Sequence, residues 1–442
     1  MSMSLLISVL WAIVILLAYF QFWPIVQKQK LSPLTACLLI ASLAFISRQI
    51  PCILLPMGAM YDIDSYRMVG SVILQGGDVY SHPDLVKRYP YLPLQMYWMA
   101  FSVWFSEHFQ LSLVKVVKQA PIMADVGIAI ILFRYFHRSN QTEIALHSGL
   151  LYALNPIAIF VSAYHGQFDA IPTLCILLAI YWLDRSPLIA GFWHGLGILD
   201  KSWPVLAIFS LVKSISGWRK KFYFLCATFT IPLTGVILYI ILFPSNLVDV
   251  LTRALGYNHG VGVWGYTSII RMIAVLNPNL SFLFLLFIEN GRYLTLGILG
   301  LVWIIRARSE MPHEGVLTIL LAFFAGTHAF SIQYLMWLVP FAILSRDFRF
   351  LKFYTLGAFG YMLLTYSTLI LEPHIYSLFT QQQADWIIIL SSFPAWIATI
   401  YWLKQRLFRS HKRLSETVKN SSTEQLSLIF SKLDQSRPTE HK

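Results

Sequence analysis

The sequence predicts an all-α, polytopic membrane protein, and three observations lead to that prediction. Hydrophobic residues make up 57% of the 442 residues and charged residues only 12%, whereas soluble domains carry roughly a quarter charged residues. Many apolar runs reach the roughly 20 residues that cross a bilayer core, and clear examples are residues 5–25, 222–243 and 387–403. A transmembrane β-barrel would instead show alternating strands of about 10 residues.

Clusters of Lys and Arg between the apolar runs set the predicted topology. Such clusters mark cytoplasmic loops, and placing them all on one side predicts about 13 transmembrane helices. The first run lacks a basic leader and a small-residue cleavage site, so we expect it to be a retained helix. The formal net charge of +12 then reflects cytoplasmic loops, and no nucleic-acid partner is expected.

The chain reads as one membrane domain over residues 1–403 and a polar cytoplasmic tail over 404–442. Two long loops fall on the opposite, outer face, at 58–112 and 244–280. Within them, the aromatic stretch 92–105 and residues 266–276 are expected to form helices along the membrane surface. Helices 187–200 and 203–213 are short, as discontinuous helices around a binding site often are.

Asp62 and Asp64, in the first outer loop, are the candidate catalytic residues. Two carboxylates that are two residues apart on an extended loop point the same way. Either could serve as a general base, or both could bind a divalent cation through oxygen. That cation is the one candidate cofactor, and a solvated acidic turn is the plainer alternative.

A second polar run, at residues 164–169, follows a proline at 156 that is expected to kink the incoming helix. It brings His165, Gln167 and Asp169 to the outer face, where they suit sugar hydroxyls or a phosphate. Lys201 lies at the next outer turn. A lysine there needs a partner, either the adjacent Asp200 or an anionic ligand such as a lipid phosphate.

Other polar residues are weaker candidates. Arg271 in the second outer loop is a candidate to reach a donor phosphate. Gln333 and Tyr334 lie at the outer end of a late helix pair, where an interfacial aromatic belt is the alternative. Arg48 and Asp125, inside apparent spans, are expected either to pair or to face a cavity. Lys115 and Lys118 begin a helix and are expected to snorkel to lipid headgroups.

In their order along the chain, these features resemble the GT-C superfamily of membrane glycosyltransferases. The likeness is greatest to the catalytic subunit of the GPI first-mannose transferase and its prokaryotic relatives. It rests on Asp62-x-Asp64, Tyr91-x-Pro93, Asp125, Asn155-Pro156, Gly166-x-x-Asp169, Lys201-x-Trp203-Pro204 and Ser331-x-Gln333-Tyr334-x-x-Trp337. The chain departs from the family in an additional N-terminal helix, in Pro90 before Tyr91, and in His165 where an arginine is common.

The resemblance implies an inverting hexosyltransferase, with mannose as the expected sugar, that uses a polyprenyl-phosphate sugar donor and a lipid or glycan acceptor. It implies a site on the periplasmic or luminal face, with Asp62 as the base and Tyr91 among the binding residues. The cell membrane is the expected location, and the endoplasmic reticulum membrane is the alternative. A transporter or flippase, or a polymerase of lipid-linked saccharides, remains an alternative function.

Overall fold

The computed structural model describes residues 3–26, 31–55, 58–256, 260–305 and 311–366. Within 379–408 it describes all residues except 381, 384, 385 and 388. The described chain is helical, and its one extended pairing is an isolated antiparallel bridge between Val261 and Ala329. The predicted all-α class is confirmed. The predicted tail beyond residue 408 lies outside the described residues, and residues 404–408 continue the last helix, which runs over 389–408.

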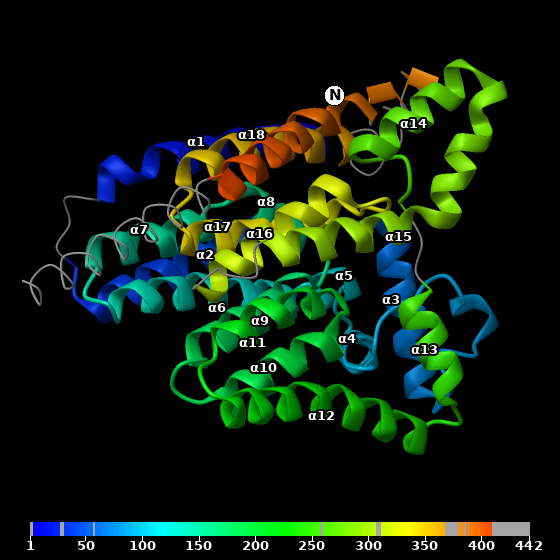
Figure 1. Cartoon of the computed structure of the whole chain (residues 1–442), viewed down its shortest axis with the longest axis horizontal. Helices are drawn as coiled ribbons and strands as arrows, with labels where there is room; N and C mark the ends of the chain where they lie inside the picture. Colours follow the sequence, from blue (N-terminus) through cyan, green and yellow to red (C-terminus); the bar gives the residue numbers. More distant parts are fainter. Residues whose placement is uncertain are drawn as a thin grey trace, which may run out of the picture.

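The helices follow one another along the chain, and the long connection between α3 and α4 includes the short turn η1 (Figure 1). Their bounds are α1 (Met3–Val26), α2 (Pro33–Leu54), α3 (Met60–Leu74), α4 (Gln95–His108), α5 (Leu113–Val117), α6 (Gln119–His137), α7 (Thr142–Ala153), α8 (Pro156–Ile159), α9 (Ala170–Trp182), α10 (Pro187–Asp200), α11 (Ile208–Ser214), α12 (Trp218–Leu242), α13 (Leu247–Leu255), α14 (Gly265–Leu276), α15 (Ser281–Ile305), α16 (Pro312–Gly326), α17 (Leu338–Leu344) and α18 (Phe348–Tyr366). Short turns add η1 (Pro83–Leu85), η2 (Phe160–His165), η3 (Trp203–Ala207), η4 (Pro278–Leu280) and η5 (Ile332–Met336).

Four helical segments of the described chain are long and apolar enough to cross a membrane. They are Pro33–Leu54, Leu113–His137, Trp218–Leu242 and Pro278–Ile305. A fifth span results if α7 and the segment Pro156–His165, bent by 41° at residues 154–155, count as one. Membrane-spanning helices are therefore confirmed, whereas the predicted count of about 13 is not.

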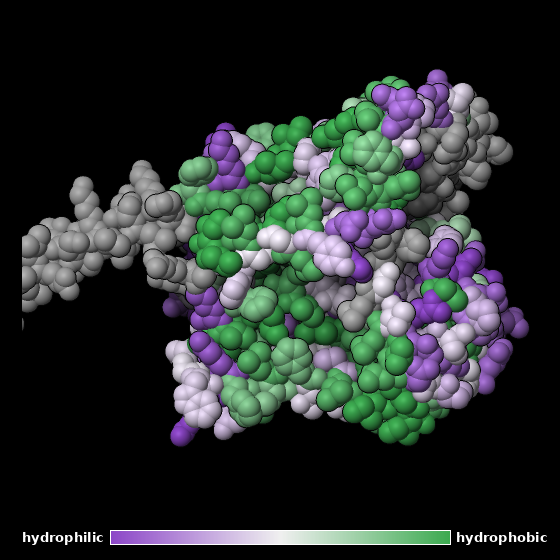
Figure 2. Space-filling view, turned by 45° about the vertical axis from the view of Figure 1, so that its right-hand side comes forward, coloured by the Kyte–Doolittle hydropathy of each residue, from purple (hydrophilic) through white to green (hydrophobic). Residues whose placement is uncertain are grey.

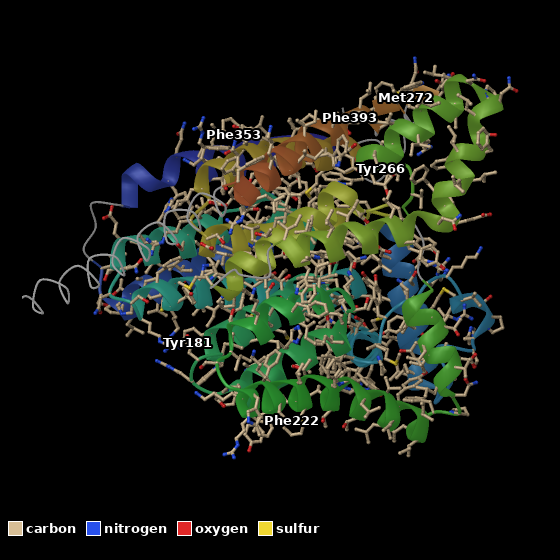
Figure 3. All side chains as sticks on the ribbon, in the orientation of Figure 1. Tyr181, Phe222, Tyr266, Met272, Phe353 and Phe393 are labelled. Carbon is tan, nitrogen blue, oxygen red and sulfur yellow. The ribbon has the colours of Figure 1, made fainter. Side chains whose placement is uncertain are left out.

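The two ends of the helical bundle differ in the elements they hold. The start of α12, whose first turn carries Arg219, Lys220 and Lys221, lies at the left-hand end, and α3, α13 and α14 of the two outer loops lie at the right-hand end (Figure 1). In Figure 3, Tyr181 and Phe222 mark the left-hand part and Tyr266 and Met272 the opposite part. Apolar residues cover much of the face in Figure 2, and hydrophilic residues gather toward its right side. Which end lies on which side of the membrane stays a prediction from charge.

The first outer loop is a folded unit. It opens with α3, which packs on α4 so closely that a Cβ at Gly70 would lie 2.7 Å from the Met99 carbonyl oxygen. Asp78 accepts a hydrogen bond of 2.7 Å from the Tyr239 hydroxyl of α12, which in turn accepts one from the Val79 amide. Arg253 of α13 donates to the Tyr80 carbonyl. The loop is thus tied to α12 and to the second outer loop, which gives its residues fixed positions.

Candidate active site

The segment around His165 takes its shape from its sequence. Asn155 caps α8, its side chain accepting hydrogen bonds from the amides of Ile157 and Ala158, and Pro156 occupies the first helical position, where a missing N–H costs nothing. The helix then widens into the π-helical turn η2, a feature frequent at functional sites. Gly166 ends the turn with φ of +88°, a left-handed conformation that glycine adopts without strain. The kink predicted at Pro156 is confirmed.

This turn meets the first turn of α3 and builds a carboxylate site. The Nε2 atom of His165 lies 2.8 Å from Oδ2 of Asp62, and the Gln167 amide donates to the same oxygen at 2.7 Å. Because an ionised carboxylate only accepts hydrogen bonds, the histidine nitrogen is the donor. The backbone fits closely as well, since the Ala59 amide donates to the His165 carbonyl at 3.3 Å. Three residues that the sequence placed on the outer face therefore form one cluster.

The environment of Asp62 favours its charged form. Burial would raise the pKa of this carboxyl, but the hydrogen bond and charge of His165, the hydrogen bond from Gln167 and the charge of Lys201 outweigh it and lower the pKa. The side chain keeps an exposed fraction of 28%, so one edge stays open to a ligand. An ionised, oriented and accessible carboxylate is suited to accept a proton.

The expectation that Asp62 and Asp64 point the same way is wrong. Both lie on helix α3 and not on an extended loop, and residues two apart on a helix face different sides. Asp64 is exposed, whereas Asp62 contacts His165. The pair therefore does not form the shared cation site that an extended loop would give. Among the described residues, no group of three or more His, Cys, Asp or Glu could hold a metal ion.

A second cluster is centred on Asp169, two residues after Gln167 in the sequence. The Lys201 ammonium donates to both carboxylate oxygens of Asp169, at 3.0 and 2.9 Å, and the Trp337 indole donates to Oδ1 at 2.7 Å. The predicted pairing of Lys201 with the adjacent Asp200 is therefore wrong, because Asp169 takes that place; the alternative, an anionic ligand such as a lipid phosphate, stays a prediction. Lys201 follows α10 in an extended conformation, and the neighbouring Asp200 accepts a hydrogen bond from Gln95.

Aromatic rings enclose the Lys201–Asp169 pair. The ammonium lies 5.0 Å from the centroid of the Tyr91 ring and 5.8 Å from that of Tyr334, distances that allow cation–π attraction. Tyr334 stacks on Trp337 at 4.2 Å, and Trp337 stacks on Trp203 at 4.3 Å. Tyr334 is therefore not part of an interfacial aromatic belt, because its ring packs in this cluster.

The other two predicted binding residues are Gln333 and Arg271. Gln333 is buried next to Tyr334 in η5. Arg271 lies on α14 in the second outer loop, with its Cδ 2.9 Å from where a Cβ on Gly262 would lie. Both outer loops thus contribute elements to the same end of the molecule (Figure 1).

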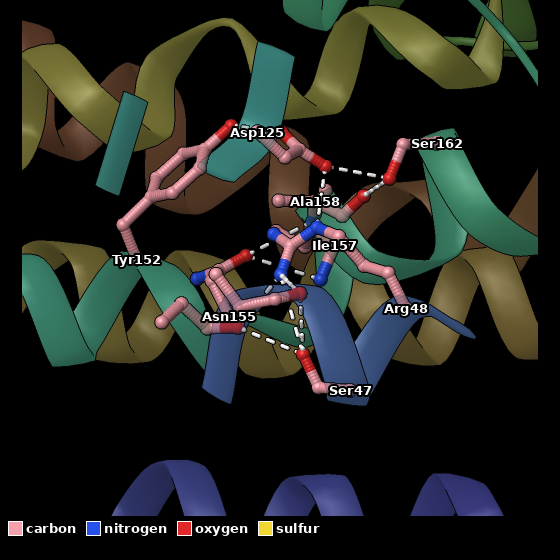
Figure 4. A network of polar contacts seen from close by, with 10 residues as sticks. Ser47, Arg48, Asp125, Tyr152, Asn155, Ile157, Ala158 and Ser162 are labelled. Atoms are coloured by element: carbon pink, nitrogen blue, oxygen red, sulfur yellow. Dashed lines mark hydrogen bonds and ion pairs between the residues drawn. The ribbon is translucent and has the colours of Figure 1, made fainter. Parts of the chain in front are cut away.

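Beneath the π-helical turn lies a buried polar network (Figure 4). Arg48 donates to Oδ2 of Asp125 at 2.6 Å, and both side chains are fully buried. The hydroxyls of Tyr152 and Ser162 donate to the same carboxylate, each at 2.5 Å. The predicted Arg48–Asp125 pair is confirmed. Since Ser162 lies three residues before His165, the network also anchors the turn that carries the histidine.

Two features near the site were missed or misjudged from the sequence. Lys118 does not snorkel to headgroups: its side chain is buried, and a Cβ on Gly166 would lie 3.2 Å from its Cε. Arg88 places its guanidinium 4.4 Å from the Tyr61 ring centroid and donates to the Ser65 hydroxyl at 3.1 Å, beside Asp62. The Tyr-Pro run after Arg88 marked the region, but sequence spacing alone could not connect it to α3.

Comparison with known families identifies the class of protein. The model of glycosyltransferase family 87 matches residues 91–331, more than half of the chain. The chain belongs to glycosyltransferase family 87. A search of the curated proteins found no match. The matched range holds His165, Gln167, Asp169 and Lys201, and Asp62 lies before it.

Membership in glycosyltransferase family 87, together with the apolar helices, makes this chain a membrane glycosyltransferase, which acts on a sugar donor and an acceptor. It supports the broader part of the resemblance drawn from the sequence. The closer likeness to the GPI first-mannose transferase is not confirmed and stays a prediction, as does the choice of sugar.

Proposed function

We propose that this member of glycosyltransferase family 87 transfers a hexose, with mannose as the first candidate, from a polyprenyl-phosphate donor to a lipid or glycan acceptor on the non-cytoplasmic face. The observation that carries the proposal is the Asp62 carboxylate held by His165 and Gln167 in a folded outer loop. Family membership supports sugar transfer, and the position of the loop opposite the basic turns supports the outer face.

In the proposed reaction, Asp62 removes the proton from an acceptor hydroxyl while that oxygen attacks the anomeric carbon of the donor sugar. The bond between the anomeric carbon and the phosphate oxygen breaks, and polyprenyl phosphate leaves with the bonding electrons. The transfer is one displacement, so the configuration at the anomeric carbon inverts. His165 and Gln167 both occupy Oδ2 of Asp62, which leaves Oδ1 to take the proton. General base catalysis and positioning act together here.

Asp62 is preferred to Asp64 as the base because of its surroundings. Its carboxylate is oriented by two donors, whereas Asp64 is exposed on another side of α3. The mechanism has no step that needs both carboxylates. It therefore assigns no role to a cation held between them.

Lys201 is proposed to contact the donor phosphate. An ammonium has three N–H donors, and the Asp169 carboxylate takes two of them, which leaves one for a phosphate oxygen. Tyr91 and Tyr334, whose rings flank the ammonium, would border the same ligand. Stabilising the developing charge on a leaving phosphate is an electrostatic contribution of the kind that enzymes use widely.

A donor panel tests the proposal. Purified protein in nanodiscs is given polyprenyl-phosphate mannose, polyprenyl-phosphate glucose and the matching nucleotide sugars, with a membrane lipid extract as acceptor. We expect label to move into the extract from a polyprenyl-phosphate sugar only. Transfer from nucleotide sugars alone would reject the donor class. Substrate counterflow across sealed vesicles without any sugar transfer would favour the flippase alternative instead.

A further inference from the structure

A groove far along the chain from the carboxylate site lies between α18 and the last helix, at residues 389–408. The two helices run antiparallel. Asp347, just before α18, pairs with Arg406, and a Cβ on Gly357 would lie 2.9 Å from the Ala395 amide nitrogen. Between these contacts a cavity of about 700 Å³ opens on the surface. In Figure 3, Phe353 of α18 and Phe393 of the last helix lie along the upper edge of the molecule.

One end of the groove is basic. Arg346 and Arg349 line it, both exposed. Arg346 sits in a left-handed conformation with φ of +56°, a costly state for a residue other than glycine unless its surroundings hold it. Its guanidinium contacts Gln141 and lies 5.2 Å from the Phe136 ring centroid. Among the described residues that line the groove, Asp347 is the one carboxylate, and its charge is offset by Arg406 at 2.5 Å.

The rest of the groove is apolar and exposed. Its walls are formed by Phe353 and Leu356 of α18 and by Ile397 and Tyr401 of the last helix. From Arg349 to Gly357 is eight residues, or about 12 Å along a helix. That length matches the upper part of an acyl chain. A basic mouth above an apolar channel at the Lys/Arg-rich end of a membrane protein suits an anionic lipid of the cytoplasmic leaflet.

We propose that this groove is a binding site for an anionic phospholipid. Arg349 and Arg346 bind the headgroup phosphate, and one acyl chain lies along Phe353, Leu356, Ile397 and Tyr401. The site is separate from the sugar-transfer reaction and does not depend on it. On its buried side α18 contacts η5, because the Tyr354 hydroxyl donates to the Leu335 carbonyl at 2.8 Å.

Native mass spectrometry of the full-length protein, titrated with dioleoyl phosphatidylglycerol or dioleoyl phosphatidylcholine, tests the site. We expect wild type to bind the anionic lipid at lower concentration than the neutral lipid. Arg349→Gln should weaken phosphatidylglycerol binding about 10-fold or more, since it removes a charge-assisted hydrogen bond. Arg349→Lys, which keeps the charge, should restore most of the binding. Ala398→Phe places a large side chain in the apolar part of the groove and should also weaken phosphatidylglycerol binding.

Matched controls decide the result. Lys352→Gln removes a charge from an exposed position of α18 outside the groove, and Ile400→Phe enlarges an exposed apolar residue of the last helix outside it; both should bind like wild type. Equal binding of the two lipids by wild type would overturn the proposal, and so would equal losses in Arg349→Gln and Lys352→Gln. A wild-type dimer that Ala398→Phe dissociates, without loss of lipid, would assign the groove to a second copy instead. If Ala398→Phe fails to fold, the comparison of lipid binding by Arg349→Gln and Lys352→Gln still tests the proposal.

Discussion

Asp62→Asn is expected to lower kcat/KM for sugar transfer by about 100- to 10,000-fold, the range for loss of a general base. The amide keeps an oxygen that can accept hydrogen bonds from His165 and Gln167, and the side chain is partly exposed. The fold should therefore survive, and the loss should appear in catalysis. The measurement is the initial rate of label transfer by protein purified to equal monodispersity.

Two further variants sharpen this result. Asp84→Asn removes a carboxylate from η1, an exposed position in the same outer loop, and should leave the rate near wild type. Asp64→Asn distinguishes between the two candidate carboxylates, and it should lower kcat/KM far less than Asp62→Asn does. If Asp64→Asn alone abolishes transfer and Asp62→Asn does not, the base is Asp64.

Asp169→Ala is expected to destabilise the protein by about 3–5 kcal/mol, because it leaves a buried ammonium without its partner. Lys201 is 6% exposed and Asp169 is fully buried, and the carboxylate also holds the Trp337 indole. Transfer activity should fall as well, since Lys201 would lose its position between Tyr91 and Tyr334. Chemical denaturation in detergent measures the stability, and label transfer measures the activity.

The double variant Asp169→Leu/Lys201→Met separates charge from packing. Replacing both members of a buried pair by apolar residues is often close to neutral for stability, so much of the lost stability should return. Activity should not return, because the proposed phosphate contact is gone. Wild-type stability in Asp169→Ala would contradict the view that the ion pair is buried and dependent on its partner.

The sequence indicated the membrane class and several residues of the candidate site because both depend on local signals. Apolar runs of spanning length, the Asn155-Pro156 break and carboxylates outside the spans can each be recognised along the chain. The Arg48–Asp125 pair was also predictable, since a charge within a span needs a partner.

Other features depend on contacts between distant segments, and these the sequence did not reveal. Lys201 pairs with Asp169, 32 residues earlier, and not with its neighbour Asp200. Asp62 and Asp64 diverge because α3 begins at Met60, although the polar, glycine-containing stretch favoured an extended loop. Lys118 is buried because Gly166 leaves room for its side chain. Each case depends on how helices meet, which local patterns do not specify.

The central claim is that the ionised carboxylate of Asp62, which is hydrogen-bonded to His165, is the general base. The pH profile of kcat/KM tests it most directly. In wild type the contacts from His165, Gln167 and Lys201 lower the pKa of Asp62 against the effect of burial, so activity should be lost only as the pH falls through that lowered value.

His165→Ala removes one of these contacts, so burial is less opposed, the pKa of Asp62 rises, and the acid limb of the profile should move to higher pH. His165→Gln, which retains a hydrogen-bond donor, should move it less. An acid limb at the same pH in wild type and His165→Ala, with both proteins equally folded, would contradict the assignment of Asp62.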